Sequence, residues 1–205
     1  MTADGPRIHP GTRADVGRIT WAIARISGRV TGTGPTNLFL TLGRNRKLFH
    51  GWLRFAGRLM PGGTLPRRET ELVILRVAHL RGCAYEFEHH VTLGRRAGVT
   101  QADVARVIEG PRAGGWSARE RVLLTAVDQL HHHRDLDDPI WAAVRRELSE
   151  PQAIELVLLV GHYEMLATAI GTLRIQPDPP RRCPCPPTPR PPRHSLPRRR
   201  PRARG

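Results

Sequence analysis

The residues from Leu72 to Leu80 most constrain the fold, because apolar side chains cover most sides of the helix that they predict. Pro66 and Glu69 are typical of a first helical turn and place the start of this helix just before the apolar residues. The apolar members are Leu72, Val73, Leu75, Val77, Ala78 and Leu80. Such a helix is stable only when other elements cover it on several sides. We therefore expect a buried helix at the centre of the fold.

The rest of the body also follows a helical period, with turn and capping residues between its segments. Apolar residues recur at three- and four-residue steps from Val16 to Ile26, and again from Leu48 to Met60 before Pro61. A further helix is expected over about residues 83–97, and others start near residues 100, 117, 138 and 149. No segment shows the alternation of a strand. The sequence predicts an all-α fold, whose first helix has an apolar face formed by Val16, Ile19, Ile23 and Ile26.

The chain of 205 residues has the length of a single domain. We expect a flexible N-terminus at 1–11, a helical domain at 12–176 and a disordered tail at 177–205. The tail contains 11 of the 19 prolines and nine arginines against one acidic residue, so it has little to bury and cannot continue a helix. It carries about half of the formal net charge of +15. Nucleic-acid binding is therefore expected only through this tail, for which a solvated appendage is the other interpretation.

The apolar segments are too short for a membrane partner to be expected. No stretch approaches the roughly 18 uncharged apolar residues that a membrane span requires. The first residues also lack the apolar run of a secretory signal. We expect a cytoplasmic protein, whose three cysteines are not paired in disulfides by default.

Side chains suited to chemistry are concentrated between Cys83 and His90. Successive helical residues are rotated by about 100°, so Cys83, Glu86 and His90 share one face. Glu86 and His90 are four residues apart and can pair, which would leave one ring nitrogen for proton transfer. Glu71 lies on the apolar central helix, and a buried carboxylate needs a partner or a raised pKa. The other interpretation is structural, with Glu86 and His90 as a surface pair and Glu71 bound to an arginine such as Arg76.

The order and spacing of Glu71, Cys83, Glu86 and His90 resemble the motif of the carboxymuconolactone decarboxylase and alkylhydroperoxidase D superfamily. Redox members of that superfamily carry a glutamate, a C-x-x-C pair and a histidine at this spacing. The likeness runs through ELVILRVAHLRGC, CAYEFEHH and HVTLGRRAGVT and covers about residues 65–110, with a looser likeness over 35–58 and 117–175. The resemblance implies an alkylhydroperoxidase D-like helical domain that forms homo-oligomers, with a pocket around the two motif helices.

The departure from the redox motif is Glu86, which stands where those members place their other cysteine. A disulfide cycle between Cys83 and a C-x-x-C partner therefore cannot operate. The non-redox decarboxylase branch is the closer resemblance, and it implies a small-molecule lyase or isomerase that needs no metal or organic cofactor. Its substrate would be a small lactone or cyclic carboxylic acid.

The same resemblance suggests a role for each candidate residue. His90 would give and take the proton, Glu71 and Glu86 would orient it and tune its pKa, and Cys83 would line the pocket. Tyr85 lies within the motif and is a candidate substrate contact. For the substrate carboxylate the candidate partner is an arginine, Arg76.

Two further functions stay open at this point. Cys83 could form a sulfenic acid that an external thiol resolves, as in a one-cysteine alkylhydroperoxidase or peroxiredoxin-like enzyme. A non-catalytic oligomer that binds polyanions through its basic tail is the other alternative. The run His131–His133 resembles a metal site, but consecutive helical histidines point in three directions, so we expect no metal. His162 and Tyr163 are expected to be polar groups of the core.

Overall fold

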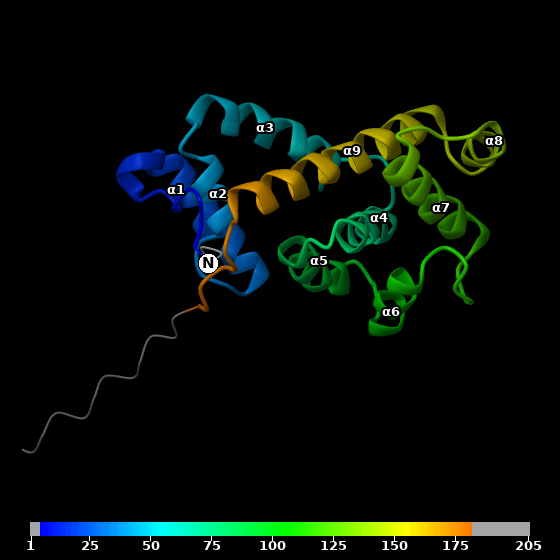
Figure 1. The fold of residues 1–205 in the computed structure, drawn as a ribbon, viewed down its shortest axis with the longest axis horizontal. Coiled ribbons are helices and arrows are strands. Elements are labelled where there is room, and N and C mark those ends of the chain that lie inside the picture. Colours follow the sequence, from blue (N-terminus) through cyan, green and yellow to red (C-terminus); the bar gives the residue numbers. More distant parts are fainter. Residues whose placement is uncertain (1–4, 182–205) are drawn as a thin grey trace, which may run out of the picture.

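The computed structural model describes residues 5–181, and over this range the protein is built from helices (Figure 1). The helices are α1 (Arg13–Thr31), α2 (Asn37–Leu42), α3 (Arg46–Leu59), α4 (Arg67–Leu80), α5 (Ala84–Arg96), α6 (Gln101–Glu109), α7 (Ala118–His133), α8 (Asp138–Glu147) and α9 (Glu150–Leu173). An isolated bridge between Thr33 and Pro180 is the only β-type pairing in this part of the chain. The predicted all-α class is confirmed, whereas the short helix α2 was not anticipated.

Helix α4 is the central element, as the sequence predicted. It packs against α5, α6, α7 and α9, and Figure 1 shows it in the middle of these helices. Every residue from Thr70 to Ala78 is buried. One side of α4 contributes Val73 and Val77 to the larger apolar cluster, while Leu72 and Leu75 enter a second cluster with α6 and α7. Burial of one such side chain stabilises a fold by about 1.5–3 kcal/mol, so α4 holds the two halves of the core together.

Helix α9 covers α4 and forms much of the larger apolar cluster. It is long and apolar enough to cross a membrane, but 56% of its apolar window is buried inside the fold. Leu156, Leu159 and Val160 are almost completely buried. Central helices of water-soluble folds share this length and composition. A capping box formed by Ser149 and Gln152 starts the helix, as predicted.

The first helix buries a different face from the one expected. Ile19 and Ile26 are 68% and 57% exposed, whereas Thr20, Ala24 and Gly28 face the body. The reason is the close approach of the chain after the helix, because a Cβ atom at Gly28 would clash with the carbonyl oxygen of Gly34. Small residues are therefore required on the face that the larger isoleucines were expected to occupy.

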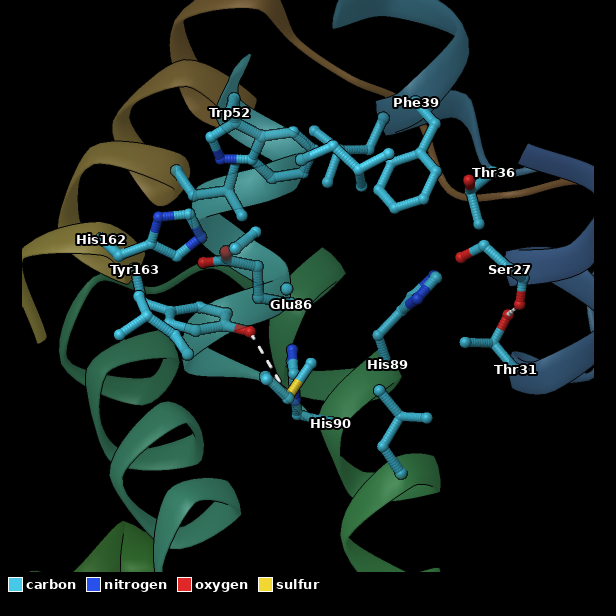
Figure 2. A pocket seen from close by; sticks show the side chains of 18 of the residues that line it. Ser27, Thr31, Thr36, Phe39, Trp52, Glu86, His89, His90, His162 and Tyr163 are labelled. Carbon is cyan, nitrogen blue, oxygen red and sulfur yellow. Dashed lines mark hydrogen bonds between the residues drawn. The ribbon is translucent and has the colours of Figure 1, made fainter. Parts of the chain in front are cut away.

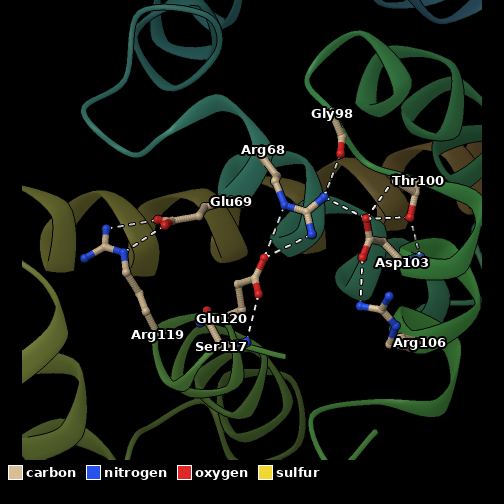
Figure 3. A network of polar contacts seen from close by, with 9 residues as sticks. All are labelled: Arg68, Glu69, Gly98, Thr100, Asp103, Arg106, Ser117, Arg119 and Glu120. Carbon is tan, nitrogen blue, oxygen red and sulfur yellow. Dashed lines mark hydrogen bonds and ion pairs between the residues drawn. The ribbon is translucent and has the colours of Figure 1, made fainter. Parts of the chain in front are cut away.

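A network of ion pairs fixes the start of α4 (Figure 3). The Arg68 guanidinium lies 2.7 Å from the carboxylate of Asp103 on α6 and 3.1 Å from that of Glu120 on α7. Its neighbour Glu69 is paired with Arg119 at 2.8 Å. Hydrogen bonds from Arg68 hold the pKa of Asp103 well below its usual range. These contacts orient α4 and so determine where its interior residues point.

Residues 176–180 lie along the body, although they fall at the start of the segment expected to be a disordered tail. Figure 1 shows this segment running from the end of α9 beside α1 and α2. The Asp178 carboxylate accepts hydrogen bonds from the backbone of Asn37 and the hydroxyl of Tyr85, both at 2.7 Å. It also lies 3.1 Å from His89 Nε2. The remainder of the predicted tail, 182–205, and residues 1–4 lie outside the described residues.

Candidate active site

A cavity of about 380 Å³ lies among α1, α2, α3, α5 and α9 (Figure 2). Its walls are mainly apolar and aromatic, and include Phe39, Trp52 and Leu166. Figure 2 shows Glu86, His162 and Tyr163 gathered on the side of the cavity opposite Ser27 and Thr31, with His90 close to them. The cavity thus brings several ionisable groups into a small and largely apolar space.

His90 is held by a buried carboxylate on the neighbouring helix. Its Nδ1 atom lies 2.7 Å from Oε2 of Glu71, whose side chain is completely buried. The other oxygen of Glu71 is paired with Arg67 at 2.7 Å, which compensates the buried negative charge. Because a carboxylate can only accept, Nδ1 carries a proton, and Nε2 is the free base of the neutral ring. Nε2 has no hydrogen-bond partner within residues 5–181, and His90 lines the cavity.

The partners of these two residues differ from those expected. Glu71 from α4, rather than Glu86 from α5, binds His90, because the two helices pack side by side and Glu71 faces α5. The arginine that pairs with Glu71 is Arg67, one helical turn earlier, rather than Arg76. Periodicity within one helix suggested the first pair, and contacts between helices decided the actual one.

Glu86 is a buried carboxyl group that lines the cavity and lies beside the Cys83 thiol. It is 3% exposed, and neither of its oxygens has a hydrogen-bond partner among the described residues. Burial, which penalises the charged form, raises the pKa of Glu86 to about 8. At neutral pH this side chain is therefore mainly a protonated acid that can donate a hydrogen bond or a proton.

Cys83 immediately precedes α5 and lies in the apolar core rather than on the cavity wall. It is 8% exposed and is not among the residues that line the cavity. Burial, and then the charge of the nearby Glu86, raises the pKa of the thiol to about 12. The backbone amides at the helix start do not outweigh these two effects. Cys83 therefore remains a protonated thiol at neutral pH, which is a poor nucleophile.

Two residues that the sequence assigned to the core also reach the cavity. His162 stacks on Trp52 with ring centroids 5.9 Å apart, and its buried Nδ1 has no hydrogen-bond partner in the described range. Burial lowers the pKa of His162 to about 4, so the ring is neutral at pH 7. Tyr163 packs edge-on against His90 at 5.2 Å and donates its hydroxyl hydrogen to the Met60 sulfur. A histidine in the middle of the most apolar helix was the signal that could have identified this wall.

Tyr85 lines the cavity, but its hydroxyl group is engaged elsewhere. The hydroxyl donates to Asp178 and accepts from the backbone nitrogen of Leu38, so the ring rather than the oxygen forms the wall. Burial raises the pKa of Tyr85 well above its ordinary value. The aromatic ring also stacks on His89 at 4.6 Å. Tyr85 can therefore shape the cavity without taking part in proton transfer.

The structure does not bring Arg76 to the cavity. Its guanidinium is paired with Asp128 at 2.7 Å and donates to the carbonyl oxygen of Val107 at 2.8 Å. Arg76 follows Glu71 by five residues, which places the two side chains about 140° apart around α4. When Glu71 faces α5, Arg76 must therefore face α6 and α7. It connects helices and leaves the cavity without the arginine that was expected.

The described residues contain no group of three or more His, Cys, Asp or Glu side chains that could hold a metal ion. His131, from the histidine run on α7, is instead 2.5 Å from the carboxylate of Glu164 on α9. Two of the imidazoles at the cavity are likewise paired with carboxylates, His90 with Glu71 and His89 with Asp178.

The fold thus places a glutamate on α4 against a histidine on α5, beside a cavity. Residues 46–129 match the model of the carboxymuconolactone decarboxylase family. The resemblance to the carboxymuconolactone decarboxylase and alkylhydroperoxidase D-like superfamily that was seen in the sequence is thus confirmed over this segment, which spans less than half of the chain. No curated protein matches the chain.

Solved structures support the same fold. An uncharacterised peroxidase-related protein from Ralstonia eutropha JMP134, described as an alkylhydroperoxidase AhpD core, has a TM-score of 0.74 and 16% identity, and covers 84% of this chain and 92% of its own. The debrominase Bmp8 has a TM-score of 0.71 and 20% identity, with 83% and 91% covered. A Bmp8 variant in complex with 2,3,4-tribromopyrrole has a TM-score of 0.70 and 19% identity, with 82% and 90% covered. At these identities the likeness establishes the fold.

Proposed function

We propose that this protein is an acid–base enzyme, a lyase or isomerase that removes a proton next to the carbonyl group of a small lactone or ring ketone. The observation that carries this proposal is the pairing of Glu71 with His90 at 2.7 Å, which leaves Nε2 of His90 as a base at a cavity. Glu86 supports it, because a protonated acid without a partner lines the same cavity. A superfamily that includes decarboxylases and a debrominase is consistent with an enzymatic role.

In the proposed reaction His90 and Glu86 act on neighbouring atoms of the substrate. Nε2 of His90 takes the proton from the carbon next to the carbonyl group, and the electron pair moves toward the carbonyl oxygen. Glu86 donates a hydrogen bond to that oxygen, where negative charge develops. Glu71 stabilises the imidazolium that forms, through its contact with Nδ1.

The fate of the resulting enolate determines the reaction class. Return of the proton from His90 to a different carbon of the conjugated system completes an isomerisation. Loss of a leaving group from the adjacent carbon, with its bonding electron pair, completes an elimination. Decarboxylation would form the same enolate by loss of carbon dioxide, and His90 would then have to start as the protonated acid. The groups at this cavity can serve all three, and we favour proton abstraction because the contact with Glu71 directs the proton of a neutral imidazole to Nδ1 and makes Nε2 the free base.

We further propose that the chain belongs to the non-redox branch of the superfamily. The residue in place of the second motif cysteine, Glu86, supplies the acid of the proposed reaction. Cys83 has a pKa of about 12 and lies off the cavity wall, which argues against the thiol peroxidase alternative. Trapping of sulfenic acid on Cys83 after treatment with an alkyl hydroperoxide, with catalytic peroxide loss, would favour that alternative instead.

The isomerisation of α-angelica lactone to its conjugated β isomer tests the proposal, because it needs only a base and an acid beside a small lactone. The full-length protein should catalyse this conversion, followed by its ultraviolet absorbance, and His90→Gln should lower the rate by about 100-fold or more. Cys83→Ala is the matched control and should retain the rate. Equal rates for the wild type and His90→Gln would refute the proposed role of His90.

We also propose that the protein assembles into homo-oligomers. Helix α9 exposes an apolar strip formed by Ile154, Leu158 and Met165, which are 61%, 47% and 51% exposed. Apolar strips of this kind are typical of contact surfaces between subunits. Sedimentation equilibrium should give a mass that is a multiple of 22.9 kDa, and Leu158→Glu should reduce it. A monomer at micromolar concentration would contradict this proposal.

A further inference from the structure

We propose that the substrate bound in this cavity is an uncharged ring compound that presents hydrogen-bond acceptors, and that the cavity discriminates against carboxylate anions. This inference rests on the proposed function for the identity of the site, and it specifies the class of molecule that the site accepts. It departs from the cyclic carboxylic acid suggested by the sequence. The inference depends on the charges around the cavity and on the polar atoms that its walls leave without partners.

The cavity wall carries no permanent positive charge. Among the described residues that line it, the ionisable side chains other than tyrosines are Glu86, His89, His90 and His162. No arginine or lysine of the described range is part of this wall. A carboxylate entering the cavity would therefore leave water without gaining a cationic partner.

The arginines closest to the motif residues are already paired with carboxylates. Arg67 lies 2.7 Å from Glu71, which binds His90 and is not among the residues that line the cavity. Arg81, next to the start of α5, lies 3.5 Å from Glu164. Recruitment of either guanidinium by a substrate would leave a buried or half-buried carboxylate without its partner.

The histidines do not replace the missing arginine. His162 is neutral at pH 7, because burial lowers its pKa to about 4. His89 is paired with Asp178 at 3.1 Å. His90 would have to be protonated to attract an anion, and it would then no longer be the base of the proposed reaction. An anionic substrate thus conflicts with the chemistry as well as with the charge of the cavity.

Several buried polar atoms of the wall lack a hydrogen-bond partner, and they indicate what a ligand must present. These atoms are Oγ1 of Thr36, Nε1 of Trp52, both carboxyl oxygens of Glu86 and Nδ1 of His162. The indole nitrogen of Trp52 can only donate, and the protonated Glu86 also has a hydrogen to donate. A ligand that satisfies both must offer acceptors, such as carbonyl or ring oxygens, at more than one position. Unpaired buried groups of this kind are a common basis of specificity.

The shape of the cavity favours a flat ring. Phe39 and Trp52 form an aromatic wall with centroids 5.7 Å apart, and the ring of Tyr85 contributes another surface. The volume of about 380 Å³ is near the lower end of the ~300–1,000 Å³ typical of small-molecule sites. One or two fused rings with oxygen substituents therefore fit both the size and the chemistry of the walls.

Coumarin and coumarin-3-carboxylate provide a matched test, because they share an aromatic lactone and differ by one carboxylate. Calorimetric titration of the full-length protein at pH 7.5, in 0.3 M salt to screen the basic tail, should give a Kd for coumarin at least ten-fold lower than for the carboxylate. Leu93, a half-buried residue of the cavity wall, is the position for a gain of charge. Leu93→Arg should reverse the preference, while Leu93→Met, its neutral control, should keep it.

The outcomes separate this inference from the proposed function. Equal affinity for both probes, tighter binding of the carboxylate by the wild type, or no binding of coumarin would overturn the inference. His90→Gln should keep the preference for coumarin and lose the isomerisation of α-angelica lactone. A protein that prefers coumarin but isomerises the lactone equally well without His90 would support the inference and refute the proposed role of that histidine.

Discussion

Replacement of Glu86 by glutamine should make the protein more stable at pH 8 than the wild type. The pKa of this carboxyl group is about 8 in the folded protein, against an ordinary value of 4.5. At ~1.4 kcal/mol for each pH unit, ionisation of Glu86 in the fold costs up to about 5 kcal/mol. Glutamine has nearly the same shape and no charge, and its side-chain oxygen can still accept from the Cys83 thiol beside this position. The cost should therefore disappear in the variant.

The sign of the effect follows from the protons bound in each state. Between pH 4.5 and about 8 the folded protein keeps the proton on Glu86, whereas the unfolded chain releases it. Stability therefore falls as the pH rises through this window. His162 has the opposite effect, because its lowered pKa of about 4 costs stability as the pH falls below 6.5. That contribution is common to both proteins and cancels in their difference.

Urea denaturation followed by circular dichroism from pH 5 to pH 9 measures this difference. The wild type and Glu86→Gln should be similar near pH 5, and the variant should gain several kcal/mol over the wild type by pH 8.5. Glu88→Gln, an exposed position on the same helix, is the control and should follow the wild type throughout. A constant difference between Glu86→Gln and the wild type over the whole range would show that Glu86 ionises normally, and the protonated acid of the proposed mechanism would be lost.

Three further predictions follow from single contacts. Cys83 should react with iodoacetamide at pH 8 much more slowly in the folded protein than in urea, since burial raises its thiol pKa to about 12. Rapid alkylation of the folded protein would favour the peroxidase alternative instead. Arg76→Ala should lower the free energy of unfolding by about 3 kcal/mol, because Asp128 loses its partner. The affinity for coumarin should stay unchanged, and weaker coumarin binding would show that Arg76 acts at the cavity. Gly28→Ala should reduce hydrogen-exchange protection of α1, because the new methyl group would clash with the carbonyl oxygen of Gly34, and unaltered protection would contradict this packing.

The replacement of a motif cysteine by Glu86 changes what the remaining residues can do. A thiol pair would make this a redox site, whereas here burial of Cys83, and then the charge of the neighbouring carboxyl group, raises the thiol pKa and lowers its reactivity. The same burial raises the pKa of Glu86 and keeps it protonated at neutral pH. One position thus both weakens the sulfur chemistry and supplies an acid, which is the physical basis for preferring proton transfer.

The sequence by itself determined the features that depend on local interactions. The helical period of the apolar residues and the capping box at Ser117 predicted the all-α class and most helix positions, because both act within a few residues of the chain. The apolar circumference of α4 predicted its central place. The spacing of Glu71, Cys83, Glu86 and His90 was enough to show the resemblance to the superfamily and to place the motif helices.

Only the tertiary structure decided which side chains meet. Glu71 rather than Glu86 binds His90 because α4 and α5 pack side by side, and the same rotation of α4 turns Arg76 away from the cavity. His162 reaches the site from α9, many residues further along the chain, where its place in an apolar helix was a local signal but could not show which residues it meets. Partners and burial depend on how helices distant in sequence pack together, and burial in turn determines the pKa values on which the chemistry depends.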